Sequence, residues 1–100
     1  MARMSRSPEL VCRRWVVEGR VQGVGYRWFA LNQAQALGVR GWVMNRDDGA
    51  VEVVGLAEAS VAEEFEGLLA KGPPGARVSR ITSEQVPHEF VESKSFHVKH

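Results

Sequence analysis

A glycine-punctuated segment at 19–27, Gly-Arg-Val-Gln-Gly-Val-Gly-Tyr-Arg, carries the residue types best suited to holding an anion. Glycine adopts backbone conformations that other residues avoid, so successive N–H groups in such a turn can point toward one site. Arg27, in the first turn of a following helix, adds a planar cation that can hold two oxygens at once. We therefore predict a cradle for a phosphate-sized oxyanion. The amides expected to form it belong to Gln22, Gly23, Val24, Gly25 and Tyr26.

A second segment at 41–45, Gly-Trp-Val-Met-Asn, ends on an amide side chain. Asn45 can accept a hydrogen bond from a water through its carbonyl oxygen and donate one to a phosphate through its amide. The same asparagine could instead be a turn residue leading into Asp-Asp-Gly at 47–49. A glycine-rich turn between a strand and a helix is also often only a tight connection. The residues alone leave both alternatives open.

The elements that would position these segments follow from hydrophobic periodicity and turn chemistry. Gly38 fits a helix C-terminus, and Ser60 followed by Glu63 is typical of a capping box that starts a second helix before the Gly-Pro-Pro-Gly run at 72–75. The expected strands lie at 11–21, 39–46, 50–56 and 76–86, the first helix lies at 26–37, and a short edge strand lies at 95–99.

The order strand, helix, strand, strand, helix, strand predicts an α+β fold of the split βαβ, or ferredoxin-like, kind (βαββαβ). Its sheet is expected to be antiparallel, with both helices on one face. Residues 11–100 should form a single domain, and 1–10 a frayed or disordered N-terminal extension.

The segments at 19–27 and 41–45 resemble the two signature segments of the acylphosphatase family. The resemblance extends over roughly 11–99, because the linker at 71–76 and Phe96 also fit. It implies an acylphosphatase that hydrolyses the carboxyl–phosphate bond of acyl phosphates to carboxylate and inorganic phosphate without metal or cofactor. Arg27 would bind the phosphoryl group and Asn45 would position the attacking water. Met44 and the ending at 96–100 depart from the family pattern.

Composition narrows the list of partners. The net charge of +1 argues against a nucleic acid held mainly by charge, and no apolar run approaches the ~20 residues of a membrane span. Cys12, the single cysteine, cannot form an internal disulfide and is expected to be packed in a protein of the reducing cytoplasm. The three histidines lack metal-ligand spacing. We expect a monomer that binds small acyl phosphates, with inorganic phosphate or sulfate as competing anions.

Two alternatives use the same fold. An RNA-binding module would need aromatic residues on the central strands, and only Trp42 supports that function, since the strand at 50–54 has none. The other is a domain that binds a phosphate ligand without turnover, such as a detached relative of the acylphosphatase-like domains in larger carbamoyl-transfer proteins. The tryptophans are expected to pack in the core or on the sheet, although an exposed one could stack on a ligand.

Overall fold

Strand β1 (Leu10–Arg20) is an interior strand of the sheet in the computed structural model, which describes residues 9–100. Trp15 and Val17 on this strand are fully buried, as the alternation in the sequence predicted. The expected extension at 1–10 lies mostly outside the described residues, and β1 already begins at Leu10. The other elements are α1 (Tyr26–Leu37), β2 (Arg40–Asn45), β3 (Val51–Glu58), α2 (Ala59–Lys71), β4 (Arg77–Gln85), the 3₁₀ turn η1 (His88–Phe90) and β5 (Phe96–Val98).

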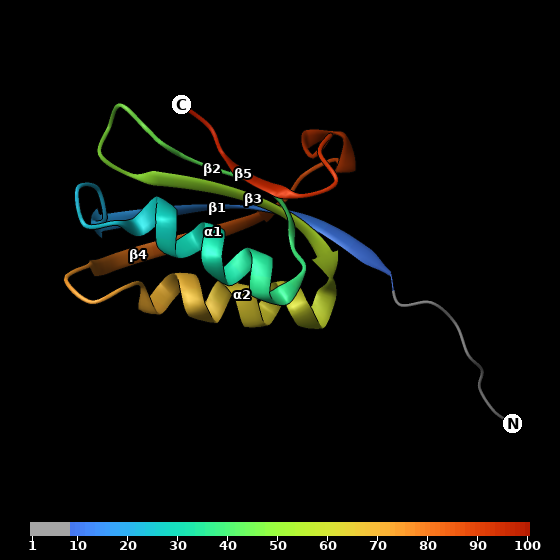
Figure 1. Cartoon of the computed structure of the whole chain (residues 1–100), viewed down its shortest axis with the longest axis horizontal. Coiled ribbons are helices and arrows are strands. Elements are labelled where there is room, and N and C mark those ends of the chain that lie inside the picture. Colours follow the sequence, from blue (N-terminus) through green and yellow to red (C-terminus); the bar gives the residue numbers. More distant parts are fainter. Residues whose placement is uncertain (1–8) are drawn as a thin grey trace, which may run out of the picture.

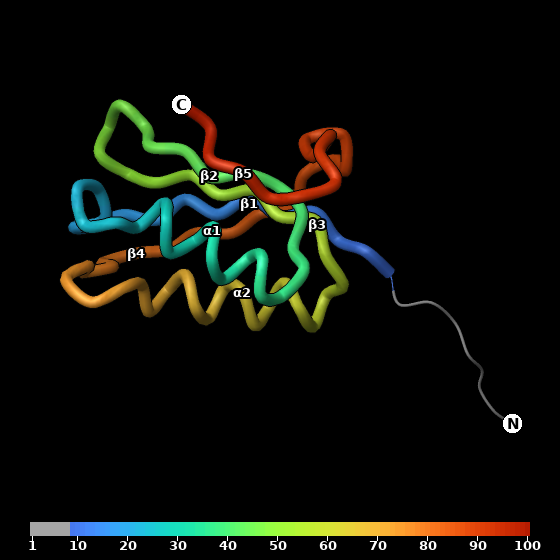
Figure 2. The backbone as a smooth tube through the Cα atoms, in the orientation of Figure 1, coloured from blue at the N-terminus to red at the C-terminus, as the bar shows by residue number. Residues whose placement is uncertain are grey.

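The sheet has the strand order β4-β1-β3-β2-β5, and both helices cover one of its faces (Figure 1). The α+β, ferredoxin-like prediction is thus confirmed. The expected edge strand also forms, but β5 pairs with β2 in parallel, so the sheet is mixed and not purely antiparallel. After β4 the chain passes η1 and returns along β2, at the edge opposite β4, in the same direction as β2 (Figure 2).

The main core fills the space between the sheet and the helices. Buried residues recur at helical spacing on both helices, for example Ala30 and Ala34 on α1. Phe65 of α2 contacts Trp15 and Phe96 edge-on, with ring centroids 5.5 and 5.9 Å apart. A smaller apolar cluster lies on the other face of the sheet and consists of Cys12, Trp42, Val54, Leu56 and Val91.

The helix ends confirm one prediction made from the sequence and contradict another. Gly38 ends α1 in the left-handed conformation (φ 74°), as predicted. The expected capping box at Ser60 is wrong, because α2 begins at Ala59 and its N-cap residue, Glu58, makes no side-chain capping hydrogen bond. Glu58 is also the last residue of β3, so the strand continues directly into the helix without a loop in which Ser60 could act as a cap.

Candidate active site

The loop at 21–25 connects β1 to α1 and leaves the start of the helix open. Gly23 and Gly25 have φ of 75° and 79°, and a Cβ on either would meet no atom within 4 Å, so glycine is required for conformation and not for space. Gly25 is the N-cap of α1, which has no capping side chain and no acidic residue in its first turn. The first N–H groups of α1 are therefore free for an external anion.

Gly19 was expected to belong to the same cradle, and that expectation is wrong. It lies inside β1, at the irregularity where β1 pairs with β4. A Cβ there would come within 2.1 Å of the Arg77 carbonyl oxygen. Gly19 is thus needed for close strand pairing, a role that the linear sequence could not separate from that of the neighbouring loop glycines.

The side chain of Gln22 ties the loop to the turn between β2 and β3. Its Nε2 donates to the carbonyl oxygens of Arg46 and Ala50, at 2.8 and 2.9 Å. The turn is itself closed by the Arg46 N–H donating to Ala50 O, and Asp48 Oδ1 accepts from the Ala50 N–H. That hydrogen bond, followed by one from Arg46, holds the pKa of Asp48 below its ordinary value. The loop and the residue next to Asn45 are thereby fixed to each other.

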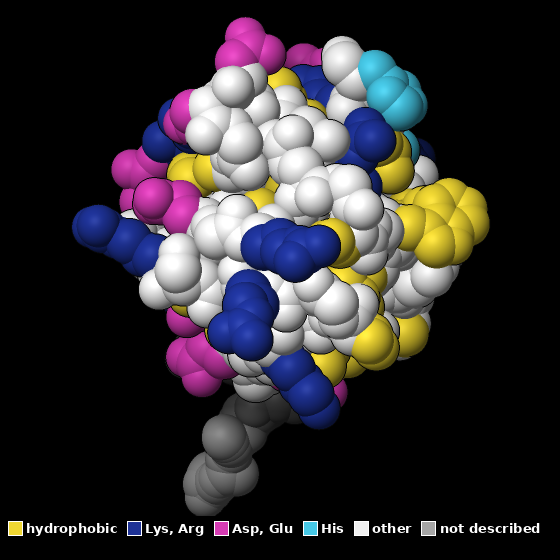
Figure 3. Space-filling model, turned by 90° about the vertical axis from the view of Figure 1, so that its left-hand side faces the viewer, with side chains coloured by type: hydrophobic (Ala, Val, Ile, Leu, Met, Phe, Trp, Pro, Cys, Tyr) yellow, Lys and Arg dark blue, Asp and Glu magenta, His cyan; other side chains and the backbone are white. Residues whose placement is uncertain are grey.

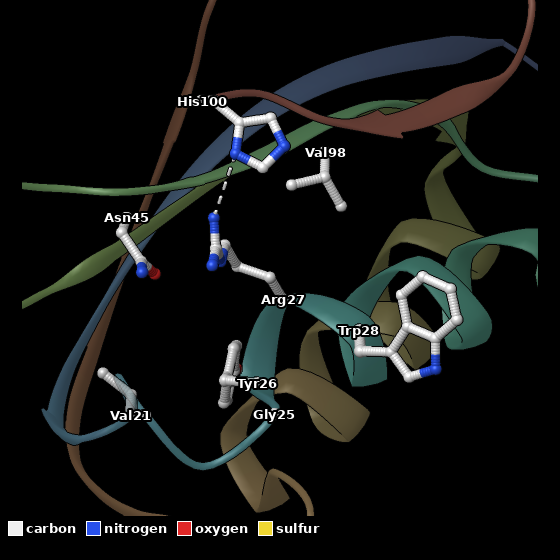
Figure 4. Close-up of a pocket in the computed structure, with 9 residues that line it drawn as sticks. Val21, Gly25, Tyr26, Arg27, Trp28, Asn45, Val98 and His100 are labelled. Carbon is white, nitrogen blue, oxygen red and sulfur yellow. Dashed lines mark hydrogen bonds between the residues drawn. The ribbon is translucent and has the colours of Figure 1, made fainter.

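Arg27 and Asn45 line one pocket of about 330 Å³, although they are 18 positions apart in the sequence. Arg27 comes from the first turn of α1 and Asn45 is the last residue of β2. Their side chains both extend into the space above the loop (Figure 4). The residues that line the pocket are Val21, Gly23, Gly25, Tyr26, Arg27, Trp28, Asn45, Val98 and His100.

Two residues predicted for the cradle do not line the pocket. The side chain of Gln22 turns toward the hairpin, and Val24 packs against the core. Tyr26 does line it, but its side chain is buried and its hydroxyl donates to the carbonyl oxygen of Leu69 in α2. Burial raises the pKa of this hydroxyl, so Tyr26 stays neutral and anchors the helix start.

Two side chains at the pocket were not singled out from the sequence. His100 Nδ1 lies 3.5 Å from Arg27 Nη1, a contact between residues too far apart for any local motif to indicate. Trp28 was expected to pack but is 66% exposed, whereas Trp15 and Trp42 are buried as predicted. Figure 3 shows this end of the molecule, with a histidine, basic side chains and a protruding hydrophobic side chain gathered at its upper right.

Comparisons with known proteins identify this arrangement. The family model described as Acylphosphatase matches residues 13–98. The chain belongs to the acylphosphatase family. It is 42% identical over 87 residues to an acylphosphatase of Koribacter versatilis, covering 87% of this chain and 78% of the relative. It is 46% identical over 76 residues to an acylphosphatase of Methanothrix thermoacetophila, covering 76% of this chain and 84% of the relative.

Solved structures that resemble this chain include an acylphosphatase. The crystal structure of acylphosphatase from Bacillus subtilis matches with a TM-score of 0.84 and 32% identity, over 92% of this chain and all of that one (100%). Full-length HypF, in a phosphate- and nucleotide-bound form, matches with a TM-score of 0.85 and 26% identity, over 97% of this chain but 13% of the HypF chain. The predicted family and its enzyme class, acylphosphatase, are confirmed.

Within residues 9–100, the sheet face that the two helices leave uncovered does not present a stacking surface for RNA bases. Trp42, on which that alternative depended, is 8% exposed, donates through Nε1 to Phe90 O at 3.0 Å, and is covered by Lys99 at 4.3 Å from the ring centroid. Arg14 bridges Glu52 and Glu84 on the neighbouring strands. Charged pairs thus occupy the positions where an RNA-binding sheet needs aromatic side chains.

Within residues 9–100, no group of three or more His, Cys, Asp or Glu side chains is placed to hold a metal ion. Cys12 is buried, and its burial raises the pKa of the thiol, as is typical of a packed cysteine side chain. Neither described helix is both long and apolar enough to span a bilayer.

Proposed function

We propose that Arg27 and Asn45 are the catalytic residues of this acylphosphatase, and that it hydrolyses the carboxyl–phosphate bond of small acyl phosphates. The observation that supports this most directly is the convergence of Arg27, Asn45 and the open start of α1 on one pocket. Among residues 9–100, the Arg27 side chain makes one exposed contact, with His100 at 3.5 Å. An arginine, an amide side chain and free backbone N–H groups are the donors that a phosphoryl group in transfer requires.

The loop amides and Arg27 bind the phosphoryl oxygens. The N–H groups at the start of α1 point outward from a helix whose dipole favours negative charge. The planar Arg27 guanidinium can contact two oxygens in parallel, which a lysine could not. Charge that develops on the equatorial oxygens in the loose transition state is stabilised without any donor having to move.

Asn45 orients the nucleophile. Its carbonyl oxygen accepts a hydrogen bond from a water, and the water oxygen forms a bond to phosphorus as the bond from phosphorus to the acyl oxygen breaks. The electron pair of the broken bond leaves with the carboxylate, which is already a stable anion, so no general acid is needed. A phosphate oxygen of the substrate takes the proton that the water loses. The products are a carboxylate and inorganic phosphate.

The same proposal covers the remaining expectations about partners and location. Inorganic phosphate and sulfate would compete for the cradle, since each presents the oxygens that the loop holds. We further propose that the active form is the monomer, since the pocket is built entirely from residues of one chain. The unpaired Cys12 is consistent with a reducing cytoplasm.

The test is hydrolysis of benzoyl phosphate in the presence of EDTA by the wild type and by Arg27→Ala. Arg80→Ala is the matched control, because Arg80 is an exposed arginine on β4 away from the pocket. We expect turnover by the wild type and the control, and a loss of about 100-fold or more in kcat/KM for Arg27→Ala. Binding of phosphate without any hydrolysis by the wild type would favour the ligand-binding alternative instead.

A further inference from the structure

The pocket has a polar side and an apolar side, and the proposed chemistry uses only the polar one. We propose that Trp28 and Val98, which form the apolar side, bind the acyl group, and that the substrates are acyl phosphates with an apolar chain or ring. This inference rests on the proposed function, because it assigns a substrate class to the same site. It concerns the half of the substrate that the phosphate cradle does not contact.

Trp28 lies at the surface of the protein and not in its core. It follows Arg27 directly in the first turn of α1 and lines the pocket, yet it is 66% exposed and lies outside the main core. Trp15 and Trp42 are 0% and 8% exposed. An indole left in water contributes little to stability, so its position next to the phosphoryl-binding arginine points to a ligand that covers it.

The in-line geometry of the reaction places the acyl group on the side of the pocket formed by Trp28 and Val98. In an in-line displacement, the attacking water and the leaving group lie on opposite sides of phosphorus. Asn45 would hold the water on one side of the Arg27 guanidinium, and Trp28 lies on the other side, beneath Val98 (Figure 4). The carboxylate must therefore leave toward these two apolar side chains.

The chemistry of this side favours an uncharged, apolar acyl group. Among the described residues that line the pocket none is Asp or Glu, and Val98 is a partly buried residue of β5 that packs against the core. An indole face and a valine offer dispersion and apolar area, and no carboxylate lines the pocket to pair with a positively charged acyl group. Acyl phosphates whose acyl group carries a positive charge are expected to be poorer substrates.

Kinetics of Trp28→Ala test the assignment. We expect kcat/KM for benzoyl phosphate to fall by about tenfold and that for acetyl phosphate by less than about twofold, because acetyl is too short to reach the indole. Phe90→Ala is the control, since Phe90 is a 43% exposed aromatic residue that does not line this pocket. Equal losses for both substrates, or no loss for either, would overturn the proposal.

A binding measurement separates this proposal from the proposed hydrolysis. Acrylamide should quench mainly Trp28 in the wild type, because the other two tryptophans are buried. Hexanoylphosphonate, which cannot be hydrolysed, should protect this fluorescence from quenching, whereas acetylphosphonate at equal occupancy should not. Protection without any hydrolysis would support the acyl-binding side while contradicting the enzymatic function. Protection by neither phosphonate, both being bound, would refute the role of Trp28.

Discussion

The side-chain amide of Gln22 donates a hydrogen bond to the carbonyl oxygen of Arg46 at 2.8 Å and so joins the loop at 21–25 to the turn after β2. This turn begins directly after Asn45, the residue proposed to hold the water. The distance between the bound phosphoryl group and the water should therefore depend on this side-chain hydrogen bond, which involves neither of them. We therefore expect Gln22 to act as a positioning residue, so that its removal affects turnover more than anion binding.

Gln22→Ala removes both hydrogen bonds to the hairpin and should lower kcat by about tenfold, because small errors in the position of a reacting group are costly. The KM should change by less than about threefold, since the backbone amides remain. Steady-state kinetics with benzoyl phosphate measure both values. Gln35→Ala, at an exposed position of α1, is the control. A kcat within twofold of the wild type would show that the hairpin is held by other contacts.

Arg27→Ala and Asn45→Ala should separate binding from turnover. Phosphate at about ten times its Kd should raise the Tm of the wild type and of Asn45→Ala by about 7 °C, and should leave that of Arg27→Ala unchanged. The kcat of Asn45→Ala should fall by about 100-fold to 1,000-fold with little change in KM. Differential scanning fluorimetry with and without phosphate gives the first result. Asn32→Ala, an exposed residue of α1, should behave as the wild type in both measurements.

Tyr26→Phe should destabilise the protein by about 1 to 3 kcal/mol at pH 8, because the buried Leu69 carbonyl oxygen loses its donor. Burial raises the pKa of Tyr26 in the folded state, whereas in the unfolded state it titrates near ~10. Above that pH the unfolded state releases a proton that the folded state keeps, so the stability of the wild type falls as the pH rises.

Because Tyr26 is the only tyrosine, the stability difference between wild type and Tyr26→Phe should narrow between pH 8 and pH 10.5. Urea unfolding at these two pH values measures the stability difference. The buried Cys12, whose pKa is also raised, contributes an alkaline loss to both proteins and cancels in the comparison. A difference that is constant with pH would mean that Tyr26 is not protected from ionisation.

His100→Ala should raise the inhibition constant of inorganic phosphate by about threefold and leave kcat nearly unchanged. Its contact with Arg27 is exposed and, at 3.5 Å, lies at the upper limit of a hydrogen bond, so it is weak. We expect this contact to limit the orientations of the guanidinium before an anion binds. His97→Ala, on β5 and outside this pocket, is the control. A kcat reduced more than tenfold by His100→Ala would indicate a direct part in proton transfer.

Local patterns in the sequence predicted most of the fold. Alternating apolar residues define β1, and Gly38 marks the end of α1, because both signals depend on near neighbours in the chain. The capping box failed because tertiary structure runs β3 straight into α2. The parallel pairing of β5 with β2 was also missed, since it depends on the path of the chain after β4 and not on the residues of β5.

The candidate site was predicted only in part. The glycine loop, Arg27 and Asn45 could be proposed from two segments, but nothing local shows that they share a pocket. The contacts of Gln22 with the hairpin and of His100 with Arg27 join residues far apart in the chain. The exposure of Trp28 was equally hidden, because a tryptophan in an amphipathic helix is usually packed.

The two strands that pair with β1, β3 and β4, are distant from it in the sequence. Arg14 lies opposite Val54 on β3 and opposite Glu84 on β4. Long loops must close before either pairing can form, so folding is expected on the millisecond to second scale and not in microseconds. The end of β1 and the loop that follows it gain fixed neighbours only when those loops have closed. A chain that is still folding should therefore have no affinity for phosphate, and phosphate should slow unfolding without accelerating folding.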